Sequence, residues 1–379
     1  MAKRRGNGEG SITKRKNGTW MGRVMVGRNS NGKPLIKTVY GKTRKEVSEK
    51  LIKITNDINT GTYVEPSKLK VEQWLTNWLE EYKQINLKPT TYDCYEKMIK
   101  NHINPSIGNI LLKDLKTEHI QRVYKDKYNN GKGLSTGTLR KIHVIVKSAL
   151  EQAVINGLII KNPADGAKLP LHKQKEIKVF TVEEQKRFIN CAKDYRLYEA
   201  FVFDLDTGLR LGELLALKWD DIDLKKGTVS VNKNLVVVKN RDDNNDKKTS
   251  LLIQDTTKTK SGKREIPLTK RTLNLLKQLK LKNPKGSDIV FCSEKGTYIS
   301  PRNFERTFKK VIAKAKIENC NVHTMRHTFA TRLIESGVSI KVVSELLGHA
   351  DVIVALNTYA HALPNTKKEA VEMLDKLFG

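Results

Sequence analysis

The sequence predicts a multidomain protein with an N-terminal three-stranded antiparallel sheet plus helix, an all-helical domain, and a mixed, mainly α domain with a small β-sheet. Three observations carry this prediction. Residues 1–60 alternate apolar and polar side chains, residues 67–158 show helical periodicity, and residues 175–379 mix both patterns. A chain of 379 residues has room for two or three domains of this kind.

Residues 1–60 are expected to form the sheet and its helix. Turn signals at Asn17–Gly18 and at 29–32 separate the alternating segments, and residues 43–58 then space apolar side chains for a helix. The segment holds 15 Lys and Arg but only 4 acidic residues. A small basic sheet of this kind is built around a surface for an anion, and a β-ribbon fits the major groove of DNA.

Residues 67–158 are expected to be entirely helical. The periodicity predicts helices at 71–82, 90–103, 116–128 and 136–158. Trp74 and Trp78 are spaced to lie on one face and are interpreted as core packing, and Gly157 suits the end of the last helix. Segments 59–68 and 159–178, which lack periodicity, are interpreted as linkers.

Residues 175–379 are expected to open with a helix, because Thr181 and Glu184 form a capping box. A helix interrupted by glycine follows, then a strand at 227–239 and a strand pair turning at Ser261–Gly262. Ser300 is expected to cap another helix, with proline at its first position. The remaining helices break at Gly337 and Gly348, and a last helix is expected at 365–379.

The composition indicates a polyanionic partner. Lys and Arg outnumber Asp and Glu by 71 to 41, a net charge of +30, and nucleic acid is the usual partner of such a chain. A merely soluble basic surface is the alternative interpretation. No apolar run of about 18 residues and no secretory signal is present, so neither a membrane span nor export is expected. Four widely spaced cysteines fit free thiols, and the protein is expected to be cytoplasmic.

His323, Arg326 and His327 fall within about one helical turn, so three cationic groups would share one side of a helix. They repel one another unless an anion compensates them. The His-x-x-x-His spacing, with Cys320 nearby, also permits a metal site. A metalloprotease glutamate is absent and Arg326 occupies the intervening turn, so an anion site is preferred and no metal is expected.

The chemistry that fits these groups is attack on a phosphodiester. Arginines can stabilise the non-bridging oxygens, and the reaction further needs a nucleophile, a base and an acid. The sequence offers candidates for each of these roles: Arg210, Lys258, His323, Arg326, His349 and Tyr359. Tyr359 alone would be interpreted as packing, and its hydroxyl, with an ordinary pKa of about 10, needs a cationic surround to react as phenolate. Acidic clusters for two-metal chemistry and a nucleotide-binding loop are absent, so no cofactor is expected.

Five motifs follow one another along the chain: "TGLRLGE", "KTKSGKREIPL", "HTMRH", "LLGH" and "NTYAH". In this order they resemble the tyrosine recombinases, and more narrowly the integrases of phages and conjugative transposons. The resemblance covers the whole chain. It implies an arm-type DNA-binding domain at 1–60, a core-binding domain at 67–158 and a catalytic domain at 175–379. It implies a site-specific recombinase that integrates and excises a mobile element through a 3′-phosphotyrosyl intermediate.

The resemblance also implies a role for each motif residue. Tyr359 would be the nucleophile, Arg210 and Arg326 would clamp the phosphate, and Lys258 would protonate the leaving 5′-oxygen. His323 would accept the tyrosine proton and His349 would hydrogen-bond the phosphate. Glu213 would orient neighbouring side chains, and His327 would support packing and hydrogen bonding. Lys260 and Lys263 share the hairpin with Lys258 and remain alternatives for the acid.

The implied partners are double-stranded DNA at arm-type and core-type attachment sites and three further protomers, with the tail at 365–379 exchanged between neighbours. Packing of that tail within its own chain is the alternative. An excisionase or a DNA-bending protein is a further implied partner. Two other functions stay open: a non-catalytic, architectural DNA-binding protein, and a type IB topoisomerase-like enzyme that relaxes supercoils without pairing two sites.

Overall fold

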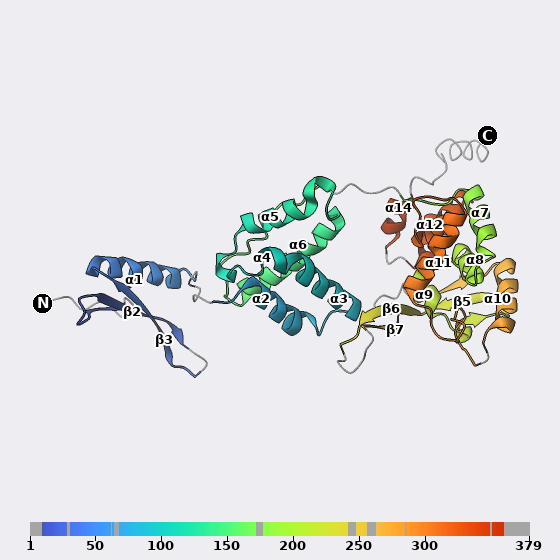
Figure 1. The fold of residues 1–379 in the computed structure, drawn as a ribbon. Helices are drawn as coiled ribbons and strands as arrows, with labels where there is room; N and C mark the ends of the chain where they lie inside the picture. The colour runs from blue at the N-terminus through green and yellow to red at the C-terminus, as the bar shows by residue number, and fades with distance from the viewer. Residues whose placement is uncertain are drawn as a thin grey trace, which may run out of the picture. The chain divides into compact units, whose positions relative to one another are not determined.

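The computed structural model describes residues 10–28, 31–61, 63, 68–171, 177–241, 248–255, 263–284, 286–348 and 351–359. Three sets of predicted features lie outside these residues: the hairpin lysines Lys258 and Lys260, His349, and the tail helix at 365–379. The chain divides into two compact units, Met1–Lys173 and Gln174–Gly379, and the division falls in the predicted linker 159–178 (Figure 1).

The N-terminal part is a three-stranded antiparallel sheet covered on one face by a helix (Figure 1). Its elements are β1 (Ser11–Lys14), β2 (Trp20–Arg28), β3 (Pro34–Gly41) and α1 (Arg44–Asn59), and the strands pair in the order β1-β2-β3. Val24 of the sheet and Val47 and Leu51 of the helix are buried together. At Gly22 a Cβ atom would lie 2.6 Å from Val47, so the helix packs where the sheet has no side chain. The predicted sheet and helix are confirmed.

The next part of the first unit is all-helical, as predicted (Figure 1). Its elements are α2 (Val71–Asn77), η1 (Trp78–Lys83), α3 (Pro89–Met98), η2 (Ile99–Ile103), α4 (Asn104–Ile107), η3 (Leu112–Asp114), α5 (Thr117–Tyr128), η4 (Asn129–Gly131) and α6 (Thr136–Ile155). Trp74 and Trp78 are buried, and the Trp74 indole donates to the Ala149 carbonyl at 2.8 Å. Both tryptophans therefore serve the core. Gly157 adopts a positive φ just after α6, as a helix end requires.

The second unit is mainly helical, with two small sheets. Its helices are α7 (Val182–Ala192), α8 (Tyr198–Thr207), α9 (Leu211–Ala216), η5 (Trp219–Asp221), α10 (Lys270–Lys282), α11 (Pro301–Lys314), α12 (His323–Glu335), α13 (Ile340–Leu347) and α14 (Val352–Tyr359). Its strands are β4 (Ile222–Asp223), β5 (Thr228–Val231), β6 (Lys233–Lys239), β7 (Thr249–Asp255) and β8 (Arg264–Pro267). The capping box at Thr181 and Glu184 and the cap at Ser300 are both present.

The described strands of the second unit belong to two sheets, which pair as β4-β5-β8 and β6-β7. The predicted turn at Ser261–Gly262, with residues 256–259 that would face β8 across it, lies outside the described residues. The predicted single strand at 227–239 is two strands, β5 and β6, which belong to different sheets. Hydrophobic alternation marks a segment as a strand but carries no information about its partner, which explains this error.

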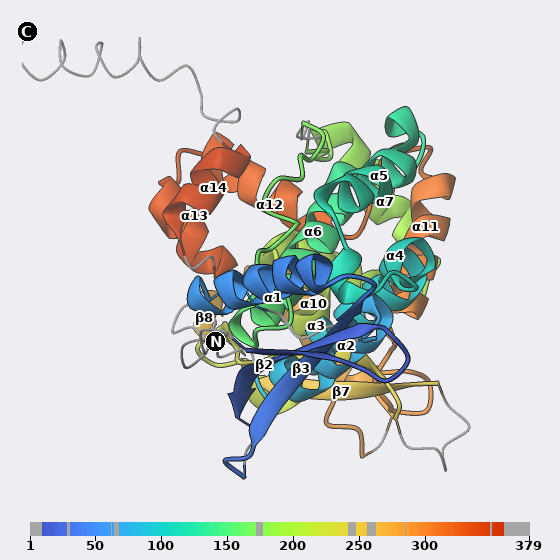
Figure 2. The same ribbon diagram turned by 90° about the vertical axis from the view of Figure 1, so that its left-hand side faces the viewer.

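Two packing features position the candidate site. Helix α8 ends at Gly208, whose φ of +61° closes the helix and lets α9 start in a new direction. Helices α12, α13 and α14 pack around a small core of their own, seen as the orange and red group in Figure 2. That core holds Ala330, Ile334, Val343, Leu347, Ala355 and Tyr359. The site residues thus sit on a fixed framework of short helices.

Within the described residues, no helix has the length and apolar character needed to cross a bilayer. The four cysteines, all of them described, carry free thiols.

Candidate functional site

Arg210 lies at the start of α9, directly after the break that Gly208 makes. Its guanidinium donates to Glu213 Oε1 at 2.8 Å and to the Gly348 carbonyl at 3.2 Å, while its backbone N–H donates to Glu213 Oε2 at 3.0 Å. Glu213 therefore caps the helix and orients the arginine at the same time. The Arg210 side chain is 41% exposed, so part of the guanidinium faces solvent.

Arg326, on α12, is buried and bridges two segments. Nη1 donates to the Gly208 carbonyl and Nη2 to the Leu347 carbonyl, both at 2.7 Å. Burial lowers the pKa of Arg326 to about 10, with further lowering by Arg210, so the guanidinium remains protonated at neutral pH. Its side chain ties the end of α8 to the end of α13.

A third arginine completes the cluster. Arg264, the first residue of β8, donates Nη2 to Glu213 Oε2 at 2.8 Å and Nε to the Leu346 carbonyl at 2.7 Å. The three consecutive carbonyls of Leu346, Leu347 and Gly348 thus each accept from a different arginine. The carbonyl end of a helix carries partial negative charge, which suits three cations.

The charge of this cluster is unbalanced. Burial would raise the pKa of Glu213, but the hydrogen bonds and charges of Arg264 and Arg210 hold it below its usual range, so Glu213 is ionised. Asp204 is buried, and burial raises its pKa well above the ordinary value despite the opposing charge of Arg326, so it is protonated. Its carboxyl oxygens have no hydrogen-bond partner among the described residues. Three guanidiniums therefore face one carboxylate, and the excess positive charge suits an anion.

Tyr359, the last residue of α14, lies within the small core rather than at the surface. It is 1% exposed, and His327 Nδ1 is 2.8 Å from its hydroxyl. Burial lowers the pKa of His327 to about 4, and the neighbouring His323 and Arg326 act in the same direction. The imidazole is therefore neutral at neutral pH, and a neutral ring nitrogen can accept the tyrosine proton.

Burial also decides the state of the tyrosine. It raises the pKa of Tyr359 to about 12, although the charge of Arg326 acts in the opposite direction. The sequence predicts a cationic surround that would favour phenolate. In this arrangement desolvation outweighs the cation, and the hydroxyl is neutral.

His323 opens α12 and is exposed, and its ring lies 6.0 Å from that of His327 between centroids. Although the residue is exposed, partial desolvation by the surrounding protein lowers its pKa, and the charges of Arg326 and Arg210 lower it further, so His323 is available as a proton acceptor. In the structure, however, the tyrosine hydroxyl contacts His327 rather than His323. The histidine to which the motif assigns only packing and hydrogen bonding is the one that holds Tyr359.

The structure therefore gathers most of the predicted residues: Arg210, Glu213, His323, Arg326 and Tyr359. Lys258 and His349 lie outside the described residues, and Lys263, the third hairpin lysine, precedes β8. Sequence reasoning missed Arg264. Its signal was the alternation of β8, in which Arg264 and Ile266 turn inward while Glu265 and Pro267 face out.

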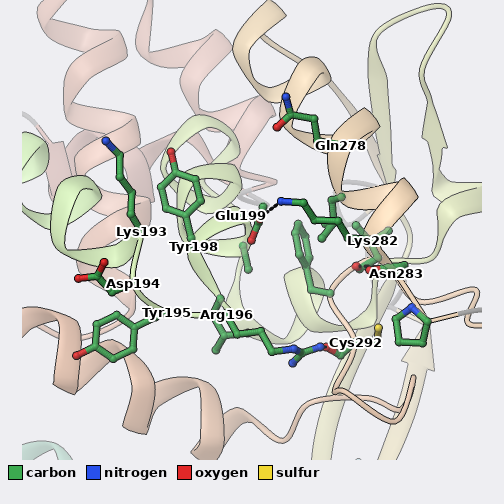
Figure 3. A pocket seen from close by; sticks show the side chains of 16 residues that line it. Lys193, Asp194, Tyr195, Arg196, Tyr198, Glu199, Gln278, Lys282, Asn283 and Cys292 are labelled. Atoms are coloured by element: carbon green, nitrogen blue, oxygen red, sulfur yellow. Dashed lines mark hydrogen bonds and ion pairs between the residues drawn. The ribbon is translucent and has the colours of Figure 1, made fainter.

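The predicted site residues form neither a metal site nor part of the cavity beside α10. Across the described part of the chain, no three His, Cys, Asp or Glu side chains gather as a metal group. A cavity of about 540 Å³ lies between the α7–α8 junction and the end of α10, where Lys282 and Glu199 approach to 3.9 Å (Figure 3). None of the predicted site residues lines it. The candidate site is the arginine cluster.

Two family models match the chain. Residues 178–366 match the phage integrase family, and residues 70–128 match the phage integrase N-terminal SAM-like domain. The first match spans the whole arginine cluster and Tyr359.

Curated relatives and solved structures agree with these matches. A tyrosine recombinase XerC-like protein of Caldanaerobacter subterraneus is 35% identical over 94% of this chain and 95% of its own length. The ICEBs1 integrase of Bacillus subtilis is 29% identical over 78% and 80%. The Tn1549 transposon integrase shares the fold, with a TM-score of 0.69 and 23% identity over 81% of this chain and 99% of that one. A lambda integrase structure covers 96% of this chain and 97% of its own at a TM-score of 0.60 and 19% identity.

The full-length similarity to a tyrosine recombinase, together with the family match over the arginine cluster, settles the class of this protein. The chain belongs to the phage integrase family of tyrosine recombinases and is a site-specific DNA strand-transfer enzyme.

Proposed function

We propose that this enzyme integrates and excises a mobile element by cutting and rejoining DNA through a 3′-phosphotyrosyl link to Tyr359. The observation that carries the proposal is the convergence of Arg210, Arg326 and the end of α13, with Tyr359 in the adjoining core. Relatives that bear the names ICEBs1 integrase and transposase from transposon Tn916 support the mobile-element role.

The proposed reaction exchanges one phosphoester for another. The Tyr359 oxygen attacks the scissile phosphorus, a bond forms between them, and the bond from phosphorus to the 5′-oxygen breaks. The electron pair leaves on the 5′-oxygen, which Lys258 protonates. A 5′-hydroxyl of the partner strand later attacks the phosphotyrosyl bond and releases the tyrosine.

Charge stabilisation is assigned to Arg210 and Arg326. Negative charge on the non-bridging oxygens is largest in the transition state, and fixed guanidiniums beside it lower the barrier. The exposed part of Arg210 is already accessible. Arg326 uses one N–H of Nη1 and one of Nη2 for the two carbonyls. A guanidinium has five N–H donors, so the remaining ones are assigned to the non-bridging oxygens.

Proton transfer from Tyr359 is assigned to His323, in agreement with the motif. Its lowered pKa keeps it neutral and able to accept a proton. For this transfer the tyrosine must leave its contact with His327 and its buried position. His349 is assigned to a hydrogen bond with the phosphate.

The reaction is proposed to need neither metal nor ATP. Arginines supply the positive charge that a metal would otherwise provide, and the phosphotyrosyl ester conserves the bond that rejoining requires. The proposal therefore includes full activity in a metal chelator.

DNA binding is assigned to all three predicted domains: 1–60 for arm-type sites, 67–158 for core-type sites and 175–379 for cleavage. The outer face of the N-terminal sheet carries exposed Arg23 beside exposed Met25, Ile36 and Tyr40. Arginine contacts phosphates or guanine, and apolar side chains contact the thymine methyl group. A lambda integrase was solved as a tetramer on a Holliday junction, which supports a tetramer on DNA. Exchange of the tails at 365–379 between its protomers is a further part of the proposal.

The test is a covalent adduct on a nicked attachment-site duplex in EDTA. The wild-type chain should form a protein–DNA adduct, and Tyr359→Phe should bind the same duplex without forming one. An adduct that survives Tyr359→Phe, or an adduct that EDTA abolishes, would contradict the proposal. DNA binding without any adduct would favour an architectural protein, and relaxation of supercoils without paired sites would favour a topoisomerase.

A further inference from the structure

We propose that Arg264 is a positioning residue for strand transfer, which holds Arg210 and the end of α13 where the scissile phosphate meets them. The inference rests on the proposed function. It concerns an arginine that touches no reacting atom and acts through Glu213 and the α13 carbonyls.

The contacts of Arg264 use its whole guanidinium. Nη2 and Nη1 donate to the two oxygens of Glu213 at 2.8 and 3.3 Å, and Nε donates to the Leu346 carbonyl at 2.7 Å. The side chain is 6% exposed and that of Glu213 is 3% exposed. A planar guanidinium that is bound on every nitrogen and closed to solvent is suited to fix its neighbours rather than to bind substrate.

Arg264 also sets the charge that Arg210 presents. Glu213 shares its single negative charge between the two arginines. Without Arg264, the whole negative charge of Glu213 would act on Arg210. The partly exposed Arg210 side chain would then present less net positive charge to a phosphate. With Arg264 present, the three groups keep one surplus positive charge, and Arg210 is the member with access to solvent.

The third contact positions the chain that leads to His349. Gly348 ends α13 with a φ of +67°, and a Cβ atom there would lie 2.8 Å from Arg264 Nη1. Arg264 therefore packs against Gly348, the residue before His349, and holds the last turn of α13 through the Leu346 carbonyl. One side chain on β8 thus fixes both the arginine of α9 and the carbonyl end of α13.

The experiment compares two substrates that differ only in charge. One is the nicked attachment-site duplex, and the other carries a methylphosphonate at the scissile position, where a neutral methyl group replaces one charged oxygen. The quantity measured is the single-turnover rate of adduct formation at saturating DNA for the wild-type chain and for Arg264→Lys. Lysine keeps the charge but cannot hold both Glu213 oxygens and the Leu346 carbonyl.

On the phosphodiester, Arg264→Lys should be slower by about 10- to 100-fold, because a misplaced clamp costs that much. Its DNA affinity should stay within about twofold of wild type, since Arg264 is closed to solvent. On the methylphosphonate the deficit should shrink to less than about threefold, because a neutral phosphate gains little from Arg210. Arg271→Lys is the matched control: Arg271 binds the Asp206 carboxylate in the same unit, and its substitution should leave both rates unchanged.

An equal deficit on both substrates would overturn the inference and reduce Arg264 to a support of the fold. If Arg264→Lys is less stable, the ratio of the two rates still decides, because both substrates meet the same folded fraction. A variant as fast as wild type on the phosphodiester would also overturn it. Failure of the wild-type chain to form any adduct would instead overturn the proposed function, so the two failures are distinct.

Discussion

At the residue scale, the decisive feature is the state in which Tyr359 is held. Its hydroxyl is buried, neutral and hydrogen-bonded to His327, which is also neutral. The same burial that raises the pKa of the tyrosine lowers that of the histidine. Both effects disfavour charge in this small core, so the contact depends on pH.

The first prediction follows from His327. An unfolded histidine takes up a proton near pH 6.5, whereas His327 in the fold does so only near pH 4. The unfolded chain binds more protons between these values, so the free energy of unfolding should fall as pH drops from 6.5 to 4, by at most about 1.4 kcal/mol per pH unit. His327→Gln should flatten this slope in urea unfolding at several pH values. An unchanged slope would contradict the prediction, and His119→Gln, in the first unit, serves as the control.

A second prediction separates the two histidines of α12. His323→Gln should slow adduct formation by about 100-fold, because a general base contributes at least that much. His327→Gln should change the rate by less than about tenfold, since His327 is assigned to the resting contact with Tyr359. Single-turnover rates at pH 7 decide the matter. The reverse order would identify His327 as the base.

Sequence reasoning predicted part of this site. The order of the motifs identifies Arg210, Arg326 and Tyr359 as one group, and the structure places them on neighbouring elements. The burial of Tyr359 could not be predicted, because a motif records residue types and not which face of α14 is covered. Arg264 was hidden among the basic residues of its hairpin, and only its inward position distinguishes it.

At the element scale, the break between α8 and α9 does the most to shape the site. It lets Arg210 start a new helix, and the carbonyl of Gly208 accepts from Arg326. The glycine interruption was visible in the sequence. The pairing of β5 with β8 was not, because these strands are far apart in the chain and their pairing depends on the packing of the whole unit.

A third prediction tests this break. Gly208→Ala should destabilise the second unit by about 2–4 kcal/mol, because its φ is +61° and a Cβ atom would overlap the Phe329 ring. Gly337→Ala is the matched control, with a φ of +82° and open space around it, and should cost only about 1–2 kcal/mol. Urea unfolding measures both. Equal losses of stability would show that Phe329 does not restrict the break.

At the scale of the whole molecule, the net charge of +30 governs the encounter with DNA. Binding releases counterions from the phosphates, so affinity must fall steeply with salt whatever the sequence. We expect the basic N-terminal sheet to contribute through exposed arginines, including Arg15, which stacks over Tyr40 at 5.4 Å.

The fourth prediction concerns that sheet. Replacing Arg15 and Arg23 together by Gln should reduce the slope of log affinity against log salt by about 2, because each arginine is expected to neutralise one phosphate. The control is Lys53→Gln on exposed α1, which covers the opposite face of the sheet, and the slope should not change. Fluorescence anisotropy on an arm-site duplex gives both slopes. If Lys53→Gln reduced the slope by half as much as the double substitution, each position would contribute equally, and binding would not depend on the outer face.

The burial of Tyr359 bears on how the protein avoids cleaving non-target DNA while it locates its own site. A basic protein that finds its site by sliding along DNA meets a vast number of ordinary phosphodiesters before the correct one. An exposed phenolate beside an arginine clamp could nick any of them. The hydroxyl is held neutral inside a core of three helices. If Tyr359 is the nucleophile, as proposed above, we expect contact with random sequence to leave the DNA intact, and only a rearrangement that frees the tyrosine to commit the enzyme to cutting.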